Sequence, residues 1–166
     1  MEYVKNITTK TGDKGTTSLY AGGRVRKDDP LIELLGELDE LQAVVAWAKF
    51  GEHRAILERV VDDIYRLMSV VGFRGRIPEG IDDIGEGDLV WMEGEMEKFS
   101  EAVGDLREFV RPGGNEQAAR LNLARAVCRR VERKFLAVEH EWGLKYLNRL
   151  SDLLFVLAYV EGCGRI

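Results

Sequence analysis

The chain has 166 residues, of which 45% are hydrophobic and 32% charged, a balance that predicts one globular domain (residues 1–166) with a substantial core. The net charge of −5 argues against a nucleic-acid-binding protein, because no basic excess offsets phosphate repulsion. No apolar run approaches the roughly 18 residues of a membrane span, and the start MEYVKN lacks signal-peptide features. We therefore expect a cytoplasmic protein with no membrane association and no nucleic-acid partner.

The cysteines and histidines give no sign of a metal site. Cys128 and Cys163 form no spaced cluster, and Cys128 lies on an apolar helical face, which favours a small buried hydrophobe. His53 and His140 have no second Cys or His nearby, so metal or catalytic roles for them are disfavoured. We expect no metal-ligating residues in this chain.

Residues 1–30 lack any helical period. The segment TTKTGDKGTTSLYAGGRVRKDDP is rich in Gly, Thr and Lys, which offer exposed N–H groups, hydroxyl donors and positive charge to an oligophosphate. It contains no GxxxxGK[ST] loop. Composition alone leaves two alternatives open, a flexible N-terminal arm or a phosphate-binding loop.

Apolar residues at helical spacing predict five helices after this segment. Asp29 and Pro30 form a helix-start signal, with an Asp cap and Pro in the first turn. The expected helices cover residues 31–50, 53–73, 88–103, 114–138 and 144–161, with a Gly-rich linker of no assigned role at 72–87. Five amphipathic helices with short connections predict an all-α bundle.

The helix at 114–138 carries a polar stripe at the edge of its apolar face. Arg125, Arg129 and Glu132 have i, i+4, i+7 spacing and stack on one side. An arginine guanidinium group that is partly shielded from water binds carboxylate or phosphate well, so phosphate recognition is one hypothesis. The alternative is an ordinary solvated edge.

Three further positions admit two interpretations each. On the first helix, Asp39 is next to the apolar stripe and is either a surface acid or the partner of an arginine. On the last helix, Asn148, Asp152 and Phe155 form a stripe that indicates a binding site or a satisfied polar network between helices. Phe109 precedes the RPGG turn, where an aromatic residue usually packs in the core.

Six motifs together resemble one known family. TKTGDKGTTSLY, KDD, LDEL, RPGG, ARAVCRRVER and YLNRLSDLLF occur in the order found in the PduO-type ATP:cob(I)alamin adenosyltransferases and extend from Thr9 to Phe155. The chain departs from the family pattern at Arg111, Gln42 and Asn122, where Leu, Asn and His are common. These departures leave the arginine stripe unchanged.

The resemblance implies a fold and an activity. Family members are homotrimers of five-helix bundles with a flexible N-terminal nucleotide-binding arm, and their active sites lie between subunits. They transfer the 5′-deoxyadenosyl group of ATP to the cobalt of cob(I)alamin, with Mg²⁺, and release triphosphate. A reductase and an adenosylcobalamin-dependent client enzyme are the partners this implies. A different class remains open, a non-catalytic trimer that binds ATP or cobalamin and delivers adenosylcobalamin, as does a purely structural bundle.

The resemblance also implies roles for individual residues. Asp39 corresponds to an acid that pairs with the equivalent of Arg125 across the subunit boundary, and Phe109 to an aromatic residue at the lower face of the corrin cobalt. Catalytic roles are implied for Arg125, Arg129, Glu132, Asp39 and Phe109. The residues implied to bind ATP are Thr9, Lys10, Thr11, Gly12, Thr17, Ser18, Lys27, Arg125, Arg129, Arg130, Glu132, Arg133 and Asn148.

Overall fold

The computed structural model describes residues 9–104, 106 and 110–162, and these are mostly helical. The elements in chain order are β1 (Thr16–Ser18), β2 (Arg24–Arg26), α2 (Pro30–Trp47), the 3₁₀ turn η1 (Gly51–His53), α3 (Arg54–Gly72), α4 (Glu86–Glu97), α5 (Ser100–Val103), α6 (Glu116–Phe135) and α7 (Glu141–Val160). All five predicted helices are present, and the third is divided between α4 and the four-residue α5.

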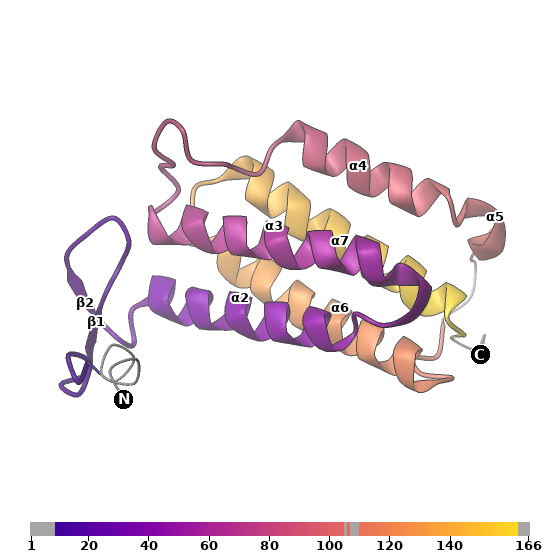
Figure 1. The fold of residues 1–166 in the computed structure, drawn as a ribbon, viewed down its shortest axis with the longest axis horizontal. Helices are drawn as coiled ribbons and strands as arrows, with labels where there is room; N and C mark the ends of the chain where they lie inside the picture. The colour runs from indigo at the N-terminus through magenta and orange to yellow at the C-terminus, as the bar shows by residue number, and fades with distance from the viewer. Residues whose placement is uncertain (1–8, 105, 107–109, 163–166) are drawn as a thin grey trace, which may run out of the picture.

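The long helices run side by side (Figure 1). α6 packs against both α7 and α2, while α3 packs on α2 and α4 on α7. Leucines and valines from each helix fill the space between them, and Leu38, Leu67, Leu121 and Leu150 are fully buried. No helix among the described residues is both long and apolar enough to cross a bilayer.

Side-chain caps fix where the helices begin. The carboxylate of Asp29 accepts from the Leu31 N–H at 2.9 Å, which confirms the predicted start of α2. Asn115 caps α6 by accepting from the Ala118 N–H at 2.8 Å. His140 caps α7 through Nδ1, which accepts from the Gly143 N–H at 3.0 Å. These caps satisfy backbone donors that have no partner inside the helix.

The N-terminal segment contains structure that an all-α fold does not include. β1 and β2 form an antiparallel hairpin in which Thr16 pairs with Arg26 and Ser18 with Arg24. The connecting turn uses Gly22 and Gly23, both with positive φ. The Ala21 N–H donates to the Gly72 carbonyl at 3.0 Å and so attaches the hairpin to the end of α3. The hairpin therefore lies at the end of the bundle where α2 begins (Figure 1).

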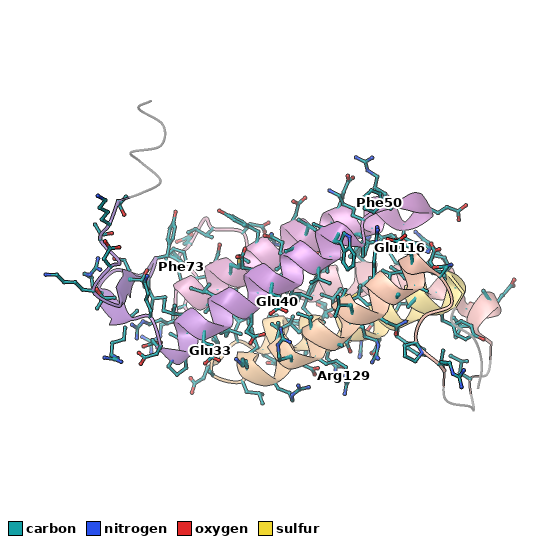
Figure 2. All side chains as sticks on the ribbon, turned by 90° about the horizontal axis from the view of Figure 1, so that it is seen from below. Glu33, Glu40, Phe50, Phe73, Glu116 and Arg129 are labelled. Atoms are coloured by element: carbon teal, nitrogen blue, oxygen red, sulfur yellow. The ribbon has the colours of Figure 1, made fainter. Side chains whose placement is uncertain are left out.

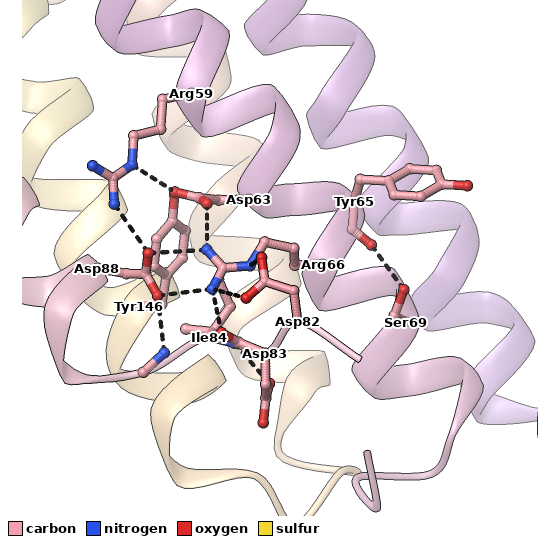
Figure 3. A network of polar contacts seen from close by, with 11 residues as sticks. Arg59, Asp63, Tyr65, Arg66, Ser69, Asp82, Asp83, Ile84, Asp88 and Tyr146 are labelled. Carbon is pink, nitrogen blue, oxygen red and sulfur yellow. Dashed lines mark hydrogen bonds and ion pairs between the residues drawn. The ribbon is translucent and has the colours of Figure 1, made fainter. Parts of the chain in front are cut away.

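A buried ionic network joins α3, α4 and α7 (Figure 3). Arg66 Nη1 donates to Asp63 at 2.7 Å and to Asp88 at 2.9 Å, and the Tyr146 hydroxyl donates to Asp63 at 2.9 Å. Burial raises the pKa of Asp63 despite the hydrogen bonds from Arg66 and Tyr146. Burial acts in the same direction on Asp88, but hydrogen bonds from Arg66 and the Gly85 N–H outweigh it and hold the Asp88 pKa below its ordinary value.

The prediction for Cys128 is confirmed. Its side chain is fully buried in the core, and its thiol donates to the Leu147 carbonyl at 3.3 Å. Burial raises the pKa of the thiol, so the nucleophilic thiolate is disfavoured.

Candidate functional site

A hollow of about 590 Å³ lies between α4, α6 and α7. Four of the residues implied by the family resemblance line it together: Arg129, Glu132, Arg133 and Asn148. The other lining residues are Leu89, Leu136, Leu144, Lys145 and Arg149. The hollow therefore combines four cationic side chains, one carboxylate, one amide and three leucines. We call it the cationic hollow.

α6 contributes the arginines and the carboxylate. Residues 129, 132 and 133 have i, i+3, i+4 spacing, which brings their side chains to one face of the helix. Glu132 is fixed across the hollow because Asn148 Nδ2 of α7 donates to its Oε1 at 3.0 Å. Arg129 and Arg133 are exposed and make no hydrogen bond or ion pair within the described part of the chain. Figure 2 shows Arg129 projecting from α6 on the side away from α2. Both guanidinium groups are thus available to an anionic ligand.

α7 contributes two cations that sequence reasoning missed. Arg149 Nε forms an ion pair with Glu93 of α4 at 2.7 Å, and Lys145 Nζ pairs with Glu141 at 2.5 Å. Lys145 and Arg149 have i, i+4 spacing and flank Asn148, so their position on the same helical face was a usable signal. The leucines from three helices carried no comparable signal, because leucine is common on every face that packs.

The polar stripe of α7 combines both of its interpretations. Asn148 lines the cationic hollow, whereas the Ser151 hydroxyl donates back to the Asn148 carbonyl at 2.9 Å, a bond internal to the helix. Burial raises the pKa of Asp152, and the nearby Arg149 and Arg129 oppose that effect. Phe155 stacks on Tyr159, with ring centroids 6.5 Å apart. The stripe is therefore a wall of the hollow at its start and a packing surface further along.

Arg125 lies on α6 outside the cationic hollow. Its Nε is buried and has no hydrogen-bond partner within the described residues. Asp39 is exposed on α2, and the two side chains make no hydrogen bond or ion pair with each other within one chain. A buried guanidinium nitrogen without a partner is costly, so the Arg125 side chain is not fully satisfied within the single chain.

Arg130 faces α2 instead of the hollow. Its guanidinium binds Glu37 and Glu40, and Lys134 on the same side pairs with Glu33 at 2.6 Å and Glu37 at 2.8 Å. Hydrogen bonding from Lys134, and then from Arg130, holds the pKa of Glu37 below its ordinary value. In the single chain, Arg130 thus ties α6 to α2.

The N-terminal residues form a separate cluster. Thr9 and Thr11 hydroxyls are 3.0 Å apart. Arg24 donates to the Thr11 carbonyl at 2.6 Å, which orders the loop from the hairpin side. A Cβ placed on Gly12 would lie 3.1 Å from Nζ of Lys27, so glycine allows that ammonium group to approach the loop backbone.

The remaining predicted residues of this segment are Lys10, Thr17 and Ser18, with Thr17 and Ser18 on β1. Lys10 has a positive φ of 58°, an uncommon backbone conformation outside glycine. No residue of this cluster lines the cationic hollow of the same chain. The structure therefore brings predicted residues together in two groups, the cationic hollow and the N-terminal cluster, and leaves Arg125, Arg130 and Asp39 outside both.

The predicted role of Phe109 and the question of a metal site remain to be considered. Phe109 lies outside the described residues. Among residues 9–104, 106 and 110–162, no group of three or more His, Cys, Asp and Glu side chains is placed to hold a metal ion.

Comparison with known proteins identifies the family. The Cobalamin adenosyltransferase family model matches residues 7–161. A corrinoid adenosyltransferase of Citrobacter freundii is 34% identical over 165 residues, covering 93% of this chain and 94% of that protein. A PduO corrinoid adenosyltransferase of the same organism is 35% identical over 93% of this chain, which spans only 49% of that relative's length.

A solved structure has the same fold. A variant PduO-type ATP:corrinoid adenosyltransferase from Lactobacillus reuteri, complexed with cobalamin and ATP, superposes with a TM-score of 0.84 at 27% identity, covering 96% of this chain and 97% of that one. The family model spans nearly all of the described bundle, and a relative above 30% identity is matched along almost its whole length. This chain belongs to the cobalamin adenosyltransferase family.

Proposed function

We propose that this protein transfers the 5′-deoxyadenosyl group of ATP to the cobalt of cob(I)alamin, producing adenosylcobalamin and triphosphate. The family membership supports the reaction, as do relatives named corrinoid adenosyltransferases and a structural neighbour complexed with cobalamin and ATP. The observation that carries the proposal is the cationic hollow, where unpaired Arg129 and Arg133 lie beside the fixed Glu132–Asn148 pair.

The reaction needs positioning and charge stabilisation more than a protein nucleophile. Cob(I)alamin supplies both electrons of the new Co–C5′ bond, the C5′–O bond breaks, and the electron pair leaves with triphosphate. The protein must hold cobalt and C5′ in line and stabilise the negative charge that grows on the leaving group. Arginine forks suit that task because they match phosphate oxygens and stay charged.

Each part of the hollow has a place in this scheme. Arg129 and Arg133 would bind phosphate oxygens. Glu132, oriented by Asn148, would accept a hydrogen bond from a hydroxyl of the nucleotide. The three leucines offer an apolar surface to the base. Mg²⁺ would arrive with the triphosphate, since this ion is usually held by substrate phosphates and few protein carboxylates.

The active assembly in this proposal is a homotrimer of five-helix bundles with sites between subunits. Two observations on the single chain support sites that are shared between subunits. The N-terminal cluster, with Lys10 and Lys27, does not line the hollow of its own chain, so a neighbour's cluster would complete that site. Arg125 makes no ion pair within the described residues of its own chain, and the exposed Asp39 of a neighbouring subunit would supply one. Phe109 would cover the lower face of the cobalt.

Anaerobic turnover tests the proposal. Purified protein mixed with ATP and chemically reduced cobalamin should form a light-sensitive organocobalt product in amounts exceeding the protein. A product limited to one equivalent would favour the alternative of a carrier for adenosylcobalamin. Absence of both product and ATP binding would refute the proposal.

A further inference from the structure

We propose that His140 and Asp83 form a brace that positions the α7 wall of the cationic hollow, so that His140 is a positioning residue for nucleotide binding. This inference rests on the proposed function. It assigns a role to the Gly-rich linker before α4, for which the sequence indicated none.

The His140 imidazole is held at both ring nitrogens. Nδ1 accepts from the Gly143 N–H at 3.0 Å, and Nε2 lies 3.1 Å from Asp83 Oδ2. Because Nδ1 is an acceptor, the ring proton is on Nε2, which donates to the carboxylate. The side chain is only 10% exposed, so it is fixed between the linker and the first turn of α7.

The linker end of this brace is itself immobilised. The other oxygen of Asp83 accepts from the Ile84 N–H at 2.7 Å, and the Asp83 carbonyl accepts from Arg66. Ile84 is 1% exposed and belongs to the core cluster. Arg66 also binds Asp88 in the first turn of α4, as Figure 3 shows. The carboxylate that meets His140 is therefore anchored to α3 and to the core.

The α7 end of the brace leads directly into the hollow. Leu144, Lys145 and Asn148 follow His140 by four, five and eight residues and line the hollow, as does Leu89 next to Asp88. The Gly143 backbone packs closely on the buried Phe135, since a Cβ there would lie 2.6 Å from Cζ of that ring. A change in the His140 contacts is consequently passed to the α7 wall, where Asn148 orients Glu132.

Three variants separate the two halves of the brace. H140A removes both contacts. H140N retains an acceptor for the Gly143 N–H but is too short to reach Asp83, and D83A removes the carboxylate while leaving the cap intact. E139A is the matched control, because Glu139 is an exposed neighbour of His140 that does not line the hollow.

The test is steady-state adenosyl transfer with MgATP as the varied substrate, well below the unfolding temperature of each variant. We expect H140A to raise KM for MgATP about three- to tenfold, as for one or two lost hydrogen bonds, with kcat within about twofold of wild type. H140N and D83A should each raise KM by less, and the H140A/D83A double variant should be no worse than H140A. E139A should match wild type.

The outcomes distinguish this inference from the proposed function. If wild type makes adenosylcobalamin while H140A has an unchanged KM and only a lower melting temperature, His140 is merely a structural cap and the inference fails. If H140A and D83A effects on KM multiply in the double variant, the two residues do not form one brace. If wild type neither binds ATP nor turns over, the proposed function itself fails.

Discussion

Arg66 differs from Arg129 and Arg133 in whether its guanidinium group has partners. We call Arg66 with its carboxylates the paired group, and Arg129 with Arg133 the unpaired group. Arg66 binds Asp63, Asp88 and the Asp83 carbonyl, and its Nε lies 3.0 Å from Asp82 Oδ2. Arg129 and Arg133 bind nothing within the described residues. A paired, half-buried arginine fixes the helices around it, whereas an unpaired one retains its capacity for a ligand. Function is therefore expected where the chain leaves cations unneutralised.

Removing Arg66 from the paired group should cause the largest loss of folding stability. R66A would leave the buried Asp63 and Asp88 carboxylates with the partly exposed Arg59, whose Nη2 lies 3.0 Å from Asp88 Oδ1 and whose Nε lies 3.7 Å from Asp63 Oδ2. Removing one partner of a buried ion pair typically costs about 3–5 kcal/mol, and the remaining Arg59 should keep the loss near the lower end of that range. Urea denaturation should show this loss, while kcat of the folded fraction should stay near the wild-type value. A loss below about 1 kcal/mol would mean that the network does not hold α3, α4 and α7 together.

Removing an unpaired arginine should lower activity while leaving folding stability unchanged, the opposite of the result expected for R66A. R129A is expected to lower kcat/KM for ATP by about 10²–10³, the usual effect of losing one preorganised group that stabilises developing charge. Its free energy of unfolding should change by less than about 0.5 kcal/mol, since Arg129 is exposed and makes no hydrogen bond or ion pair within the described residues. R76A, an exposed arginine outside the cationic hollow, is the matched control. Equal turnover of R129A and R76A would contradict the assigned role.

Lowering the pH should reduce the stability that Asp88 contributes to the Arg66 network, because Asp88 becomes protonated. Hydrogen bonds hold its folded pKa below the ordinary aspartate value of about 3.9, so Asp88 contributes stability above that pH, and the stability is lost as the pH falls through the lower folded pKa. D88N should cost about 1–3 kcal/mol at pH 7. Its free energy of unfolding should also fall less steeply than that of wild type below pH 4. Parallel pH profiles for the two proteins would rule out this contribution of Asp88.

The proposed intersubunit pair offers an intermediate case, an arginine unpaired in the chain but paired in the assembly. D39A and R125A should each lower turnover, and the double variant should be no worse than R125A alone. The coupling expected for contacting residues is about 0.5–3 kcal/mol. Independent multiplication of the two effects would exclude a bridge between Asp39 and Arg125.

Substitution of Arg130 should give the smallest effect. It separates an arginine of α6 that binds α2 from one that faces the cationic hollow. Because Glu37 and Glu40 already bind it, R130A should cost about 1 kcal/mol or less in stability, as for a partly exposed ion pair. Its turnover should exceed that of R129A clearly. A loss equal to that of R129A would instead support Arg130 as a nucleotide-binding residue.

The difference between Arg129 and Arg130 also shows how far the sequence could be read. Helical period predicted the helices and placed Arg129 and Glu132 on one stripe, because burial of an apolar face imposes that period. It could not decide whether Arg130 faces a ligand or α2, since that depends on the glutamates of another helix. The family resemblance contributed four arginines, Glu132 and Asn148 as ATP-site residues. Arg129, Arg133, Glu132 and Asn148 line one hollow, whereas Arg125 and Arg130 do not.

Other features depended on contacts that no local pattern encodes. Lys145 and Arg149 join the cationic hollow only because α7 packs beside α6. The 72–87 linker carries acids whose role depends on Arg66 and His140, which are distant in sequence or on another helix. The hairpin had a local signal that was missed, namely β-branched residues on both sides of Gly22 and Gly23.

The central claim is that the unpaired arginines of the cationic hollow hold the triphosphate of ATP. An equilibrium titration of MgATP into wild type, R129A/R133A and the matched surface variant R74A/R76A tests it most directly. We predict that wild type and R74A/R76A bind with similar Kd, while R129A/R133A binds at least about a hundredfold more weakly with an unchanged melting temperature. Equal Kd values for all three proteins would contradict the account.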